Sequence, residues 1–177
     1  MGDGCQLRQI FRLSGGEPVT TVVWSERSHI TIMQTLTNAP DLRTGFPRSP
    51  NASLGFYVIL PRIIDKCRAL IAGTNGEYNY NCPLDQGFFN FAQVDAEQFK
   101  QQIAAGKSDE ELLAWVRANS AQHSEAEIKA WSYAARWRRP EGNDTIAFFE
   151  TLRMAAVPDN YSLETWFQLL DAEEGRL

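Results

Sequence analysis

Hydrophobic positions recur with helical spacing along most of the chain after Ser53. The strongest pattern lies in residues 60–71, where apolar side chains three, four and seven residues apart form one stripe on a helix. The stripe consists of Leu60, Ile63, Ile64, Cys67, Leu70 and Ile71. Pro61 is tolerated in a first helical turn, and Gly73 is a typical helix end. The pattern therefore predicts a helix that starts at about residue 60 and closes at Gly73.

Six further helices are expected, and most have a recognisable N-terminal cap. Pro83 suits the first position of one helix, which makes Cys82 its N-cap candidate. Three later helices open with capping-box spacing: Asp95 with Gln98, Ser108 with Glu111, and Ser124 with Glu127. The last two are expected to follow Asn143 or Asp144 and Ser162. Short connections are usual in helical bundles, so we predict an all-α fold, a compact multi-helix bundle of about six or seven helices.

The first 49 residues differ, because they contain many turn formers and no sustained helical period. Two β-branched runs, Thr20–Trp24 and His29–Met33, resemble strands, but two isolated strands are marginal in a helical chain. We predict a poorly ordered N-terminal extension over 1–49 and a single helical domain over 50–177. Met33 is a candidate for the biological start, and the charged segment 171–177 is expected to fray.

Composition and charge narrow the class of protein. The chain of 177 residues is 44% hydrophobic and 11% aromatic, which is typical of a globular domain. Its net charge of −5 argues against nucleic-acid binding, which depends on basic residues that neutralise phosphates. The basic, aromatic stretch 131–139 fits the C-terminal end of a helix, which favours cations. No apolar run is long enough to span a bilayer, so we expect no membrane partner.

The three cysteines indicate the compartment. Cys5, Cys67 and Cys82 are odd in number and lack CxxC or CxxH spacing, which favours neither a disulfide framework nor a zinc site. A reducing cytoplasm is therefore the expected location.

Cys82 is the sharpest candidate for catalysis. A helix N-terminus favours a thiolate, which would make Cys82 a nucleophile or a redox thiol with Glu77 or Asp85 as its base. The competing interpretation is that Cys82 is buried as a small apolar side chain, as free cysteines usually are. The carboxylates in this stretch match no metal motif, and no cofactor is identified.

The same stretch offers a ligand site in the polar turn after the first strong helix. The candidate binding residues are Arg62, Asp65, Lys66, Tyr78, Tyr80 and Asn81. Arg62 and Lys66 would supply charge to a small polar or anionic ligand. If residues 77–81 are extended, the rings of Tyr78 and Tyr80 share one face and can stack on that ligand. Alternatively, the tyrosines pack over the core and Asp65 forms a helix-surface pair with Arg62 or Arg68.

Two segments carry a resemblance to a known family. LPRIIDKCRALIAG at residues 60–73, followed by EYNYNCPLDQ at 77–86, resembles the bacterial domain-of-unknown-function family numbered 5069. The similarity extends more loosely over about 41–137, whereas residues 1–32 depart from it. The motif residues are Leu60, Pro61, Arg62, Asp65, Lys66, Arg68, Gly73, Glu77, Tyr78, Asn81, Cys82, Pro83, Leu84 and Asp85. The resemblance implies no activity, substrate or cofactor.

Three interpretations of function follow. The first is a binding module for a small polar or anionic ligand at the turn. The second is an enzyme that uses Cys82, and the third is a protein-interaction module. The sequence does not decide among them, and it leaves the oligomeric state open.

Overall fold

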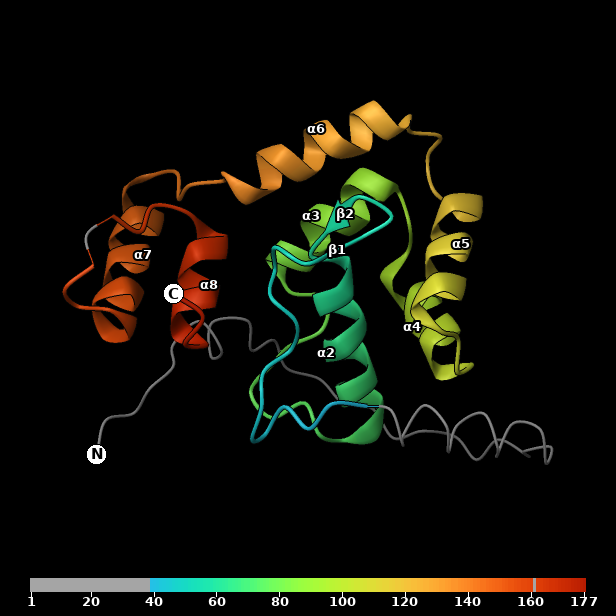
Figure 1. Cartoon of the computed structure of the whole chain (residues 1–177), viewed down its shortest axis with the longest axis horizontal. Helices are drawn as coiled ribbons and strands as arrows, with labels where there is room; N and C mark the ends of the chain where they lie inside the picture. Colours follow the sequence, from blue (N-terminus) through green and yellow to red (C-terminus); the bar gives the residue numbers. More distant parts are fainter. Residues whose placement is uncertain (1–38, 161) are drawn as a thin grey trace.

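The computed structural model describes residues 39–160 and 162–177, which form seven helices and one short hairpin (Figure 1). The all-α prediction is confirmed within these residues. The strand-like runs near residues 20 and 30, and Met33, lie outside them. The elements in order are β1 Ser53–Leu54, β2 Tyr57–Val58, α2 Leu60–Ala72, α3 Pro83–Ala92, α4 Ala96–Ala104, α5 Asp109–Asn119, α6 Glu125–Arg136, α7 Asn143–Ala156 and α8 Trp166–Glu173.

The helix α2 lies at the centre of the fold (Figure 1). It packs against α3 and α4. In Figure 1, α5 lies on one side, α7 and α8 lie on the other, and α6 runs across the top over the hairpin. The predicted stripe enters the main core, where Leu60, Ile63, Ile64 and Cys67 are fully buried. The stripe weakens at its C-terminal end, where Leu70 is exposed. The core is therefore organised around the first half of α2.

A two-stranded hairpin occupies residues 53–58, where a helical chain was expected. Gly55 and Phe56 both have positive φ, which turns the chain back so that β1 and β2 pair antiparallel. A side chain at Gly55 would meet Leu113 at 2.5 Å. The hairpin holds α6 in place, because the Ser132 hydroxyl donates to the Phe56 carbonyl at 2.7 Å.

The caps are largely as predicted, with two corrections near the C-terminus. The capping boxes at Ser108 and Ser124, and the caps at Asp95 and Cys82, are present. For α7, Gly142 rather than Asn143 or Asp144 is the N-cap. For α8, the cap is Thr165 with its capping-box partner Gln168, rather than Ser162. The Thr-x-x-Gln spacing was readable in the sequence.

The C-terminal helices have a core of their own, separate from the main one. Its buried members are Phe149, Leu152, Leu163, Leu169 and Ala172. Phe167 of α8 instead joins the main core, so α8 connects the two. Because α8 lies between the two cores, it can bring C-terminal side chains to α2.

The segment before the hairpin runs along α2. Leu42 is buried, and its amide donates to the Thr74 carbonyl at 2.9 Å. The amide of Arg48 donates to Asp65 at 2.9 Å. Residues 39–49 thus contact the helix that carries the site. Within the described residues, no helix is both long and apolar enough to cross a membrane.

Candidate functional site

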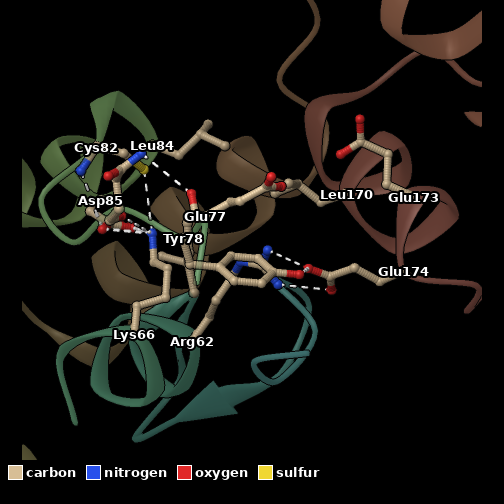
Figure 2. Close-up of a pocket in the computed structure, with 12 residues that line it drawn as sticks. Arg62, Lys66, Glu77, Tyr78, Cys82, Leu84, Asp85, Leu170, Glu173 and Glu174 are labelled. Atoms are coloured by element: carbon tan, nitrogen blue, oxygen red, sulfur yellow. Dashed lines mark hydrogen bonds and ion pairs between the residues drawn. The ribbon is translucent and has the colours of Figure 1, made fainter. Parts of the chain in front are cut away.

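One cavity lies between α2, the turn before α3 and the end of α8 (Figure 2). The two segments that carry the family resemblance, residues 60–73 and 77–86, meet there. The free volume of the cavity is about 40 Å³. The polar residues that line it are Arg62, Lys66, Glu77, Tyr78, Asn79, Cys82, Asp85, Glu173 and Glu174, and the apolar ones are Ile59, Leu84 and Leu170. The cavity therefore brings residues of α2 and of the segment 77–85 together with residues 170–174 near the C-terminus.

Arg62 and Lys66 reach the cavity from α2. They are one helical turn apart, which places them on the same face of the helix. The alternative interpretation placed Arg62 in a helix-surface pair with Asp65, yet Arg62 is 3% and Lys66 4% exposed. The surface pair is absent because the turn before α3 and the end of α8 cover this face of α2. The two cations therefore need internal partners.

Lys66 is paired with Asp85 at the start of α3. Its Nζ lies 2.7 Å and 2.8 Å from the two carboxylate oxygens, and it also donates to the Asn79 carbonyl at 3.0 Å. Burial is the largest influence and works to lower the pKa of Lys66, but the charge and hydrogen bonding of Asp85 together with Cys82 outweigh it, and the pKa is raised. Asp85 also accepts a bond from the Cys82 amide, so one carboxylate both caps α3 and neutralises Lys66.

Arg62 is paired with Glu174, which directly follows α8. The guanidinium makes two bonds to the carboxylate, at 3.0 Å and 2.6 Å, and the Tyr78 hydroxyl donates to it at 2.8 Å. Burial works to raise the pKa of Glu174, but bonding to Arg62 and Tyr78 outweighs it and the pKa is lowered. Figure 2 shows Tyr78 and Arg62 both pointing at this carboxylate. The guanidinium carbon also lies 5.5 Å from the centre of the Tyr78 ring.

Sequence reasoning missed Glu174 altogether. The segment 171–177 was expected to fray, but Asp171 and Glu174 are buried. Asp171 accepts bonds from Ser49 at 2.9 Å and Asn51 at 3.0 Å. No local signal identifies Glu174 as the partner of Arg62, because 112 residues separate them.

The surroundings of Cys82 oppose a thiolate. Cys82 is the N-cap of α3 as expected, but only 9% of it is exposed. Burial and the neighbouring Asp85 carboxylate raise the pKa of the thiol, and Lys66, 3.4 Å from the sulfur, offsets them only in part. The helix N-terminus therefore does not produce the low pKa expected from the sequence. Glu77 lies exposed at the cavity, and Asp85 is engaged by Lys66.

Three of the expected ligand-binding residues do not line the cavity. Asp65 accepts bonds from Arg48, at 2.9 Å from Nε and 2.7 Å from a terminal nitrogen, rather than pairing with Arg62 or Arg68. Tyr80 donates to the Ala96 carbonyl at 2.6 Å. Asn81 is exposed and has a positive φ of 60°.

The two tyrosines of the turn point in different directions. Tyr78 reaches Glu174, whereas Tyr80 packs edge-on against Phe89 with ring centres 5.9 Å apart. The segment is not extended as expected, because the Tyr78 amide bonds to the Asn75 carbonyl at 2.9 Å and closes a turn. The alternation of side chains in a strand, which would place both tyrosine rings on one face, is therefore absent from residues 77–81.

The charges around the cavity are unequal. Four carboxylates and two cations line it; Lys66 is paired with Asp85 and Arg62 with Glu174, which is also paired with Arg176 outside the lining. Within the described ranges, no cluster of three or more His, Cys, Asp or Glu side chains has the geometry to hold a metal ion. The cavity thus offers negative charge and hydrogen-bond acceptors.

One family model matches most of the chain. The model described as Domain of unknown function (DUF5069) covers residues 44–176. The chain belongs to this family. The DUF5069 match includes every residue that lines the cavity, Glu174 among them. A search of the curated proteins found no match.

Proposed function

We propose that this DUF5069 domain is a binding module whose cavity receives a small cationic group, such as the primary amine of a metabolite. The observation that supports the proposal is the charge of the lining, which has four carboxylates and two cations. Asp85 and Glu174 are the ion-pair partners of Lys66 and Arg62, and Glu77 and Glu173 add further negative charge. A ligand amine would find acceptor oxygens and a favourable potential there.

The pairing of Arg62 and Lys66 disfavours the anionic ligand suggested by the sequence. Each cation would have to leave its carboxylate before it could bind an anion. Breaking a buried ion pair leaves an uncompensated buried charge, which costs about 3–5 kcal/mol. A cation can enter without disturbing either pair.

The size of the cavity limits what can enter it. Since one water molecule needs roughly 10–15 Å³ of such space, a free volume of about 40 Å³ holds a few water molecules or a small head group. The rest of a ligand would extend out of the cavity, whose apolar lining includes Leu84 and Leu170. The proposal therefore concerns a small head group rather than a whole nucleotide or sugar.

The enzyme interpretation receives less support, because the Cys82 thiol is buried and its pKa is raised. The described cysteines, Cys67 and Cys82, are both free thiols. Because a reducing compartment preserves free thiols, we propose the cytoplasm as the location. We propose no nucleic-acid or membrane partner.

A thermal-shift series tests the proposal, because a ligand that binds only the folded state raises its apparent stability. The full chain is heated with methylammonium, ethylammonium and short diamines, and in parallel with matched alcohols and with acetate and phosphate. The amines should raise Tm in a saturable manner. The alcohols and anions should not.

Matched variants locate the effect. Glu77→Gln and Glu173→Gln each remove one negative charge at the cavity while leaving both buried ion pairs intact, and they should reduce the amine shift. Glu110→Gln makes the same change at an exposed position on α5 and should leave the shift unchanged. Stabilisation by acetate or phosphate alone would overturn the proposal in favour of an anion site. No shift with any amine would also overturn it.

A further inference from the structure

A second and larger cavity lies between α3, the C-terminal end of α6, and α8. Its volume is about 500 Å³, in the range of pockets that hold small organic molecules. Residues that shape it include Ile59, Leu84, Trp131, Trp137, Arg138 and Phe167. We infer that this aromatic groove binds a small aromatic anion, with its carboxylate on Arg138 and its ring against Trp137. The inference does not rest on the amine site.

One wall of the groove is fixed and another is open. Trp131 is stacked on Phe91, with ring centres 4.8 Å apart and planes 8° from parallel, so its position is set by the core. Trp137 follows the last turn of α6 and is 55% exposed. An exposed indole beside a groove offers a flat surface for stacking. The groove therefore has a rigid floor and an accessible aromatic face.

Arg138 supplies the charge for an anion. Two backbone hydrogen bonds fix the position of Arg138: its amide donates to the Ala135 carbonyl at 3.4 Å, and its carbonyl accepts from the Trp166 amide at 3.2 Å. Its neighbour Arg139 forms an ion pair with Glu164. Among the residues that the structure describes, no side chain forms an ion pair or hydrogen bond with the Arg138 guanidinium. A carboxylate could therefore bind Arg138 without displacing an internal partner.

Gly87 leaves room beside the guanidinium. A glycine inside a helix costs about 1 kcal/mol relative to alanine, yet Gly87 lies in the middle of α3. A Cβ there would lie 4.0 Å from a terminal nitrogen of Arg138. The missing side chain keeps that side of the groove open next to the available charge.

A small anion fits these charges better than a nucleic acid does. Single-stranded nucleic acids are held by several cations along the backbone together with stacked bases. Three charged residues line this groove: Arg138, Arg139, which is already paired, and the carboxylate Glu141. The whole chain has a net charge of −5. One available guanidinium beside one exposed indole matches one carboxylate beside one aromatic ring.

Calorimetric titration of the full chain with 2-naphthoate tests the inference, with 2-naphthylmethanol as the neutral ligand of similar shape. Naphthoate should bind more tightly than the alcohol. Arg138→Gln should weaken naphthoate about tenfold, the loss expected for one charge-assisted contact. Trp137→Ala should weaken both ligands. Both positions are exposed, so circular dichroism should show these variants folded.

Arg139→Gln is the matched control, because it removes the same charge from the adjacent residue. It should change naphthoate affinity by less than about twofold, as should Glu173→Gln at the smaller cavity. Equal affinity for the two naphthalenes, no binding of either, or equal losses in Arg138→Gln and Arg139→Gln would overturn the inference. So would a single-stranded oligonucleotide that binds more tightly than naphthoate and displaces it. Failure here would leave the amine proposal untouched, since that depends on other residues and ligands.

Discussion

Nζ of Lys66 lies 2.7 Å from Oδ1 of Asp85, and both side chains are almost completely buried, at 5% and 0% exposure. This pair joins the centre of α2 to the first turn of α3. A buried ion pair adds little net stability over an apolar pair of similar shape, but removing one partner is severe. The pair therefore holds the turn that forms one wall of the small cavity.

We predict that Asp85→Asn lowers the free energy of unfolding by about 3–5 kcal/mol, because it leaves the Lys66 charge buried without a carboxylate. Urea unfolding followed by circular dichroism measures the change. Glu125→Gln is the comparison, since it breaks the exposed pair with Lys129 and should cost less than about 1 kcal/mol. A similar loss in both variants would show that Lys66 and Asp85 are not coupled as described.

We predict that Glu174 makes the fold sensitive to acid. Its pKa in the folded state lies below the ordinary value of 4.5. The unfolded chain therefore takes up the proton first as the pH falls, so the contribution of Glu174 is present above pH 4.5 and is lost as the pH falls through the folded pKa.

Unfolding free energies measured from neutral pH down to pH 3 would test this for the native chain and for Glu174→Gln. The variant should be less stable at neutral pH and should lose less stability on acidification. Glu110→Gln, exposed on α5, should follow the native curve. Parallel curves for native and Glu174→Gln would contradict the prediction.

We predict that both described thiols react slowly in the folded protein. Burial raises the pKa of Cys67 to about 12, and burial with Asp85 raises the pKa of Cys82. Alkylation of a Cys5→Ser variant with iodoacetamide, followed by peptide mass spectrometry, reports each site. Both should be labelled far more slowly than in urea. Fast, selective labelling of Cys82 near neutral pH would instead support the enzyme interpretation.

Local patterns predicted the helices well because their causes are local. The capping boxes at Ser108 and Ser124 join residues three apart, at 2.8 Å and 2.7 Å from each cap amide to the glutamate. The apolar stripe of α2 requires only that one face of a helix meet a core. The hairpin at residues 53–58 was missed, because the composition of this segment suits either a helix or a strand. The positive φ angles at Gly55 and Phe56 turn the chain into a hairpin.

The sequence alone determined the helices, most of their caps, and the stretch in which polar side chains gather. Only the tertiary structure decided how those side chains are used. Opposite charge alone does not specify which two residues pair. In the structure, Arg62 forms an ion pair with Glu174 and Asp65 forms one with Arg48. The Arg62–Glu174 pair depends on the end of α8 lying beside α2, 112 residues away along the chain, and the Asp65–Arg48 pair depends on the segment before the hairpin running along α2. No helical period or cap encodes either contact.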